Sequence, residues 1–139
     1  MILIIRISGD VDISNNIREA LFRLKLRRKY VAVVVKPNEQ LLKIINMLRN
    51  HVAFGDIDKE TLSELIIRRG QLIDKKKKIR AEEIISQLDK KDLQDLGLKP
   101  FFRLHPPRGG IDSKKHFGVG KGVLGDNKSS INTLVRRML

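Results

Sequence analysis

The segment Ile2-Leu3-Ile4-Ile5-Arg6-Ile7, which Ser8-Gly9-Asp10 brings to an end, opens the unit that decides the fold. It is a short apolar run rich in β-branched residues, and such a run followed by turn residues is typical of a buried strand. Two similar runs follow: residues 30–35, which precede Lys36-Pro37, and residues 52–54, which precede Gly55. The sequence therefore predicts three strands within residues 1–55.

Helical spacing fills the two gaps between these strands. Ser14 can cap a first helix with apolar residues at positions 17, 21 and 24, and Asn38 can cap a second with apolar residues at positions 41, 42, 45 and 48. The order β-α-β-α-β predicts a two-layer α+β unit with both helices on one face of a three-stranded sheet. The pattern alone favours parallel strand pairs, because a helix connects each strand to the next.

Helices are also predicted beyond Gly55. Asp58 can cap a helix that runs to Arg69 and ends at Gly70, and further helices are predicted for residues 80–88 and 92–96. A tetralysine, residues 75–78, lies between the helix that ends at Gly70 and the helix at residues 80–88. It could contact phosphates or act as a nuclear import signal, but we prefer to interpret it as a solvated loop. A last helix after Ser129 carries apolar residues at positions 131, 134, 135 and 138.

Charge divides the chain into three parts. Residues 1–55 hold ten basic and four acidic residues, residues 56–98 hold ten of each, and residues 99–139 hold nine basic and two acidic residues, for a total of +13. We expect these parts to be a β-α-β-α-β RNA-binding core, a helical segment of near-zero net charge, and a basic Gly/Pro-rich loop followed by a C-terminal helix. Nucleic acid is the favoured partner of so basic a chain, ahead of a merely solvated cationic surface.

Two clusters of polar residues are the candidate RNA-binding residues. Five cations lie within seven residues at the end of the first helix, and a longer set follows Phe101-Phe102, where Pro106-Pro107 stiffens the chain and Gly109-Gly110 lets the backbone approach a phosphate. We expect the loop from residue 103 to 121 to become ordered against RNA. The predicted RNA-binding residues are Arg23, Lys25, Arg27, Arg28, Lys29, Arg103, His105, Arg108, Lys114, Lys115, His116, Lys121 and Lys128.

Other kinds of site fit the sequence less well. Residues 120–125 satisfy G-x-G-x-x-G, but they follow a basic loop, and the chain ends 14 residues later. His105 and His116 could form an acid and base pair, although histidines in a phosphate-contacting loop more often donate hydrogen bonds or stack. The chain has no cysteine and only three histidines, which makes a poor metal site. We expect that the protein is not an enzyme and that it binds no cofactor, no metal and no small-molecule substrate.

Membrane association is not expected either. Apolar runs such as residues 2–5 and 30–35 are far below the roughly 20 residues of a membrane-spanning helix. With no signal peptide recognisable after Met1, a cytoplasmic location is the default expectation.

Aromatic residues are scarce, at five Phe and one Tyr. This favours recognition of folded RNA by its shape and backbone over sequence readout on a stacking sheet. For Phe101, Phe102 and Phe117 we prefer a role as anchors that hold the extension on the body over a role in base stacking.

The runs FFRLHPPRGGIDSKKHFGVGKGVLGDN (residues 101–127) and INTLVRRML (residues 131–139) resemble the C-terminal region of the large-subunit ribosomal protein thirty family in its archaeal form. The first strand and VAFGDIDKETLSELIIRRG (residues 52–70) are similar to that family as well. The eukaryotic members carry a basic N-terminal extension that this sequence does not show, which favours an archaeal source.

The resemblance implies a three-stranded, largely antiparallel sheet, a ferredoxin-like unit without one strand, in place of parallel pairs. It also implies a structural constituent of the large ribosomal subunit that binds large-subunit ribosomal RNA (rRNA) and contacts neighbouring ribosomal proteins. The alternative is a non-ribosomal RNA-binding or RNA-processing protein on a similar scaffold. In either case we expect residues 1–55 to keep their sheet, with lowered stability, when residues 99–139 are removed.

Overall fold

A computed structural model describes residues 1–9, 11, 13–70, 81–87 and 98–139. The predicted tetralysine and the predicted helix at residues 92–96 lie outside the described residues. The elements in chain order are β1 (Ile2–Arg6), α1 (Asn15–Arg23), β2 (Val31–Val35), α2 (Glu39–Leu48), β3 (Val52–Asp56), α3 (Lys59–Arg69), α4 (Ala81–Gln87), β4 (Phe102–Arg103), β5 (Asp112–His116), β6 (Gly122–Asp126), the 3-10 turn η1 (Lys128–Ser130) and α5 (Ile131–Met138).

The predicted unit of residues 1–55 is present. β1 lies between β2 and β3 and pairs antiparallel with both, with Ile4 opposite Val33 on one side and Phe54 on the other. This confirms the antiparallel arrangement that the resemblance implied. The side chains of Ser14, Asn38 and Asp58 accept hydrogen bonds from backbone N–H groups three residues later, so all three predicted N-caps are confirmed.

The sheet is larger than predicted. It has six strands in the order β4-β2-β1-β3-β6-β5, and the three additional strands all come from the C-terminal extension. β4 pairs antiparallel with β2, whereas β6 pairs in parallel with β3. The expected three-stranded sheet is corrected because both of its edges, β2 and β3, have backbone groups that need hydrogen-bond partners, and the extension supplies them.

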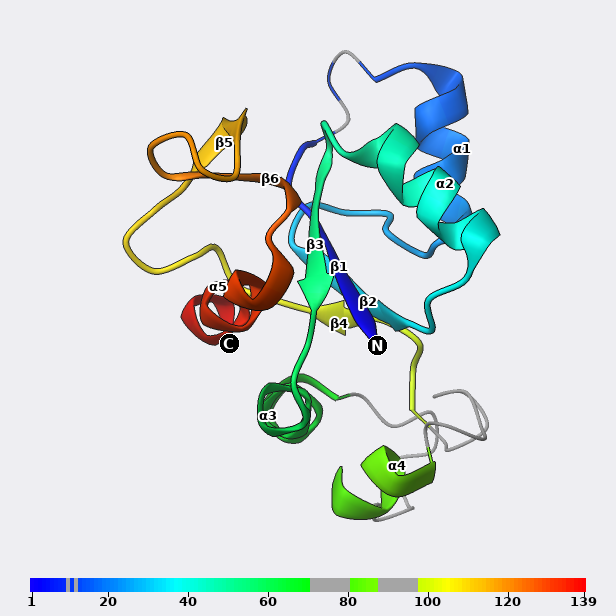
Figure 1. Ribbon diagram of the computed structural model, residues 1–139, viewed down its shortest axis with the longest axis vertical. Helices are drawn as coiled ribbons and strands as arrows, with labels where there is room; N and C mark the ends of the chain where they lie inside the picture. Colours follow the sequence, from blue (N-terminus) through cyan, green and yellow to red (C-terminus); the bar gives the residue numbers. More distant parts are fainter. Residues whose placement is uncertain (10, 12, 71–80, 88–97) are drawn as a thin grey trace.

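Helices cover both faces of the sheet, and alternate residues of β1 belong to different cores. Ile2 and Ile4 point into a core formed with α1 and α2, while Leu3, Ile5 and Ile7 belong to a second core formed with α3, α4 and α5. Figure 1 shows α1 and α2 together on one side of the strands and α5 and α3 on the other. The extension therefore contributes to the interior of the protein as well as to its surface.

α5 is fixed against β3 through a glycine. A Cβ on Gly55 would lie 2.3 Å from the carbonyl oxygen of Lys128 and 2.9 Å from the Cβ of Ile131, so only glycine permits this approach. The side chain of Asn132 strengthens the contact, because its Nδ2 donates to the carbonyl oxygen of Asp56 and its Oδ1 accepts from the backbone N–H of Asp58. Gly55 was expected to follow the third strand but lies inside β3.

Candidate nucleic-acid interface

The connection from α1 to β2 displays the first cluster of cations, which we call the basic turn: Arg23, Lys25, Arg27, Arg28 and Lys29. All five side chains are exposed. Between them, Leu26 is fully buried and its N–H donates to the carbonyl oxygen of Leu21 at 2.9 Å. Lys25 takes a left-handed conformation with φ of 64°, which ends the helix. One apolar anchor thus holds the turn in place while its cations face outward.

Arg6 supports the basic turn from inside the protein. Its side chain is fully buried, with Nη1 donating to the carbonyl oxygen of Leu26 and Nε donating to that of Ser8, each at 2.9 Å. The carbonyl oxygen of Arg6 accepts the N–H of Tyr30 at 2.7 Å, at the other end of the turn. Sequence reasoning assigned Arg6 no role, because an arginine within an apolar strand gives no indication of its partners.

β4 brings Arg103 to the basic turn. Arg103 lies opposite Val31 in the sheet, and the N–H of Leu104 donates to the carbonyl oxygen of Tyr30 at 3.0 Å. The guanidinium of Arg103 lies 5.8 Å from the centre of the Phe101 ring, and the ammonium of Lys29 lies 5.3 Å from that of Tyr30. The basic turn and Arg103 together form what we call the β4-edge patch.

The opposite edge of the sheet carries a second group of exposed residues, the β5-edge patch: Arg108, Lys114, Lys115, His116 and Lys121. β4 and β5 are the two outermost strands. Five strand spacings separate them, which places the two patches about 24 Å apart. Figure 1 shows the chain between them passing α5 on its way from β4 to β5. Two predicted residues lie outside both patches, His105 on this crossing segment and Lys128 at the start of η1.

The crossing segment is bonded to α5 within the protein itself. The N–H groups of His105 and Arg108 donate to the carbonyl oxygens of Met138 and Arg137, at 2.9 and 3.0 Å. In return, Arg137 Nε donates to the carbonyl oxygen of Arg108 at 2.8 Å, and Nη2 donates to that of Gly110. The carbonyls at the end of α5 thus give residues 105–110 hydrogen-bond partners within the protein, and ordering of the whole 103–121 loop against RNA stays a prediction.

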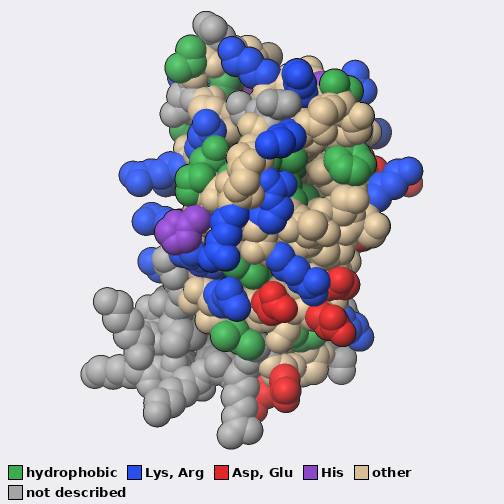
Figure 2. All heavy atoms as spheres, turned by 90° about the vertical axis from the view of Figure 1, so that its left-hand side faces the viewer, with side chains coloured by type: hydrophobic (Ala, Val, Ile, Leu, Met, Phe, Trp, Pro, Cys, Tyr) green, Lys and Arg blue, Asp and Glu red, His purple; other side chains and the backbone are tan. Residues whose placement is uncertain are grey.

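Lys and Arg side chains gather on the side of the molecule formed by β5, β6 and α5. Figure 2 shows them as a band running down this face, with acidic side chains towards its lower end. α3 carries Glu60 and Glu64, and α4 carries Glu82 and Glu83. The face formed by β5, β6 and α5 is therefore strongly basic.

The three phenylalanines of the extension differ in their surroundings. Phe102 is fully buried in the core with α3 and α5, and Phe101 packs partly buried against the core with α1 and α2. Phe117 is 45% exposed. The anchor role predicted for all three fits Phe101 and Phe102 and is wrong for Phe117.

The rival chemistries find little support in the geometry. The glycine motif at residues 120–125 covers a turn and most of β6, and does not open a helix as a dinucleotide site requires. His105 and His116 are both exposed, the first bonded through its backbone to α5 and the second at the end of β5. Within the described ranges, no group of three or more His, Asp or Glu side chains is placed to hold a metal ion.

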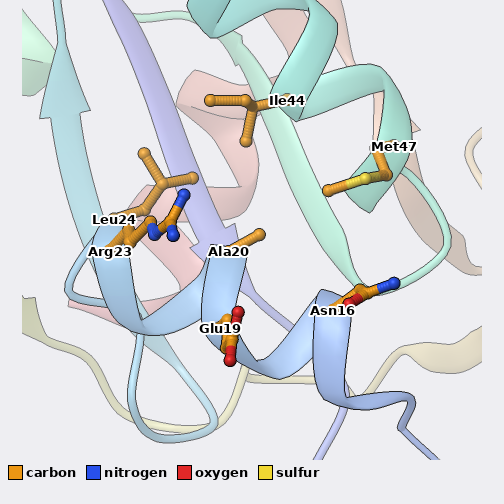
Figure 3. A pocket seen from close by; sticks show the side chains of 7 residues that line it. All are labelled: Asn16, Glu19, Ala20, Arg23, Leu24, Ile44 and Met47. Atoms are coloured by element: carbon orange, nitrogen blue, oxygen red, sulfur yellow. The ribbon is translucent and has the colours of Figure 1, made fainter.

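A small groove of about 240 Å³ lies between α1 and α2. Figure 3 shows Ala20 and Leu24 on one side of it and Ile44 and Met47 on the other. Arg23 of the basic turn is the one cation in its lining. The groove is mainly apolar and does not offer a phosphate the converging donors that the edge patches do.

Comparison with known proteins decides the family. The chain is 34% identical to the large ribosomal subunit protein uL30 of Methanococcus maripaludis, over 98% of this chain and 97% of the relative. It is 37% identical to uL30 of Aeropyrum pernix and 34% identical to uL30 of Nanoarchaeum equitans, with the same coverage. The chain belongs to the uL30 family. The resemblance inferred from residues 101–139 is thereby confirmed, and these uL30 relatives are archaeal.

No family model matches the chain. In the part of the chain that the structure describes, no helix has the length and apolar character needed to cross a membrane.

Membership of the uL30 family leaves the role of each residue to be argued from the structure. As with Arg6, sequence reasoning missed the structural role of Arg137, because it assigned Arg136 and Arg137 only to the dipole of the last helix. Arg137 instead contacts the crossing segment, and no spacing within the sequence pairs it with residues 108–110.

Proposed function

We propose that this protein is a structural constituent of the large ribosomal subunit, that it binds large-subunit rRNA in the cytoplasm, and that it performs no catalysis. The observation that carries the proposal is identity over nearly the whole length to proteins named large ribosomal subunit protein uL30. The charge of +13 and the exposed cations at both ends of the sheet support it.

Electrostatics explains how such a surface would bind rRNA. Each phosphate that a Lys or Arg neutralises releases condensed counterions, so affinity rises with the number of contacts without sequence readout. Because the β4-edge and β5-edge patches are about 24 Å apart, they would contact separate segments of folded RNA. The protein would therefore hold two parts of the rRNA at a fixed distance, with neighbouring ribosomal proteins contacting its remaining surface.

Sedimentation of cell extract tests the proposal. The protein should travel with large subunits and leave them only at high salt. A non-ribosomal RNA-binding or RNA-processing protein on the same scaffold would stay mainly in the light fractions. Recovery of most of the protein in light fractions at low salt would reject the ribosomal assignment.

The basic turn is tested by the double substitution Arg27→Ala and Arg28→Ala. Both side chains are exposed, so we expect normal folding, weaker binding to rRNA, and a salt dependence flatter by up to about 0.9 log units per lost phosphate contact. The matched control is Lys59→Ala with Arg68→Ala, which removes two exposed cations of α3 from the segment of near-zero net charge. An unchanged slope in the first variant, or an equal change in the control, would remove the basic turn from the interface.

Arg108 is tested by a substitution that keeps its charge. Arg108→Lys loses the planar fork that binds phosphate oxygens in pairs, so we expect weaker assembly into subunits by on the order of 1 kcal/mol. His105→Ala and His116→Ala provide the test of the non-enzymatic assignment. Hydrolysis of RNA by the purified protein that disappears in either histidine variant would contradict it.

A further inference from the structure

A groove of about 620 Å³ lies between the loop of residues 108–110, the turn of residues 117–121 that joins β5 to β6, and α5. We call it the turn groove. Its lining combines three cations, Arg108, Lys121 and Arg137, with the ring of Phe117. It lies on the strongly basic side of the molecule in Figure 2. Cations and an exposed aromatic ring thus share one open site.

The cations of the turn groove are held in place by the backbone around them. Arg137 donates to the carbonyl oxygens of Arg108 and Gly110, and Lys121 Nζ lies 3.4 Å from that of Gly109. Gly109 and Gly110 have φ of 81° and 73°, a conformation that turns their carbonyl oxygens towards these side chains and that other residues rarely adopt. The side chain of Arg108 is left exposed at the mouth of the groove.

Phe117 is presented by a turn with fixed geometry. The N–H of Phe117 donates to the carbonyl oxygen of Leu124 at 2.9 Å, and the N–H of Val119 donates to the carbonyl oxygen of His116 at 3.1 Å. Phe117 is 45% exposed and Val119 55% exposed, although the core with α5 lies close by. A single exposed apolar side chain is ordinary, but the ring of Phe117 lines a groove together with three cations, which the equally exposed Phe22 does not.

The chemistry of these groups selects one kind of ligand. In an RNA duplex the phosphates are accessible but the faces of the bases are stacked, so a duplex could occupy the cations and leave the ring uncovered. A base outside a helix offers its face to an aromatic ring and its own phosphate to nearby cations. A protein segment would match an apolar groove better than one lined by three cations.

We propose that the turn groove binds one unpaired nucleotide of RNA, with its base stacked on Phe117 and its phosphate at Arg108. This inference rests on the proposed function, because it names the part of the rRNA that the β5-edge patch recognises. It also revises the expectation of recognition by RNA shape and backbone alone, since one position would read the presence of an extruded base.

The test measures binding of the full-length protein to three RNA probes. One is a single-stranded oligomer on the order of 12 nucleotides long, the second is the same oligomer with abasic riboses, and the third is a duplex of the same length. Phe117→Ala should weaken binding of the base-bearing strand by about fivefold or more and leave the abasic strand and the duplex unchanged. Phe117→Tyr should retain wild-type binding.

Phe22→Ala is the matched control. Phe22 is 46% exposed on α1 and does not line the turn groove, so its removal should change none of the three affinities. Arg108→Ala should weaken both single strands and flatten their salt dependence, by about 0.7 log units for one phosphate. Urea denaturation of each variant shows whether the fold is retained.

Several outcomes would overturn the inference. Equal binding of base-bearing and abasic strands by the wild-type protein would do so, as would an equal loss in the Phe22 and Phe117 variants. Cross-linking of Phe117 to a ribosomal protein in assembled subunits would assign the groove to a protein partner. Each of these results leaves rRNA binding intact, whereas a wild-type protein that neither binds rRNA nor sediments with large subunits would reject the proposed function.

Discussion

Replacing Arg6 by methionine tests whether a buried cation fixes the basic turn. Methionine fills a similar volume but removes the donors to the carbonyl oxygens of Leu26 and Ser8, both accepted at 2.9 Å. A hydrogen bond to a charged group contributes about 1.5–3 kcal/mol, and a buried carbonyl left without a donor costs about 1–3 kcal/mol. The variant in turn avoids burying a charge, which offsets part of this loss. We expect a net destabilisation of about 3 kcal/mol.

Urea denaturation measures this difference, with Arg27→Met as the control. Arg27 is exposed, so its substitution should change the free energy of unfolding by no more than about 0.5 kcal/mol. Arg6→Lys should fall between the two, because an ammonium on a shorter chain keeps the charge but not the two-pronged geometry. A loss below about 1 kcal/mol for Arg6→Met would refute the reasoning.

The titration of His51 gives an independent readout of the same substitution. Burial, and secondarily the charge of Arg6, lower the pKa of His51 from its ordinary value of 6.5. A depressed histidine pKa means that the unfolded chain binds more protons, so its contribution to stability is present above pH 6.5 and is lost as the pH falls through the folded pKa. In Arg6→Met the pKa of His51 should rise towards 6.5, as followed by NMR, and the loss of stability at acid pH should become smaller. A His51 pKa that stays unchanged would show that Arg6 does not act on this ring.

Two further predictions concern the attachment of the extension. Gly55→Ala should destabilise the protein by about 2 kcal/mol in urea, because its Cβ would meet Lys128 and Ile131 at 2.3 and 2.9 Å, whereas Gly9→Ala, with no atom within 4 Å of its Cβ, should be nearly neutral. Removal of residues 99–139 should abolish cooperative unfolding and near-native circular dichroism. Eight of the nineteen described buried residues in the core with α3 and α5 come from that segment, a gross loss of about 12–24 kcal/mol. This equals or exceeds the usual total stability of a domain, about 5–15 kcal/mol. A truncated chain that unfolds in one sharp transition would contradict the role of the extension in the core.

The truncation prediction replaces the earlier expectation that residues 1–55 would keep their sheet alone. That expectation treated the extension as a surface loop and a docked helix, because proline, glycine and lysine dominate its sequence. The helix at residues 131–138 was predictable from its apolar spacing, and so were the caps at Ser14, Asn38 and Asp58. These features depend on residues close in the sequence, where periodicity and capping chemistry are informative.

The added strands could not be predicted in this way. β4 has two residues, β5 reads DSKKH, and β6 reads GVLGD, so none shows the alternation of an amphipathic strand. β4 and β6 pair with β2 and β3, which lie about 70 residues earlier in the chain, and β5 joins the sheet only through β6. The same separation along the chain explains why the candidate site was predicted only in part. The sequence identified the cations, but their division between two edges of the sheet depends on those pairings.

The apolar pattern of the first strand nevertheless indicates a fold larger than the 1–55 unit. All five residues of β1 are buried, and an apolar run without polar alternation is typical of a strand covered on both faces. Two helices on one face leave the other face uncovered, so residues 2–6 alone require a second layer from elsewhere in the chain. α3, α4 and α5 supply it, and the extension that contributes α5 also carries its cations from β4 to β5, so a segment that helps to complete the core also positions the candidate interface.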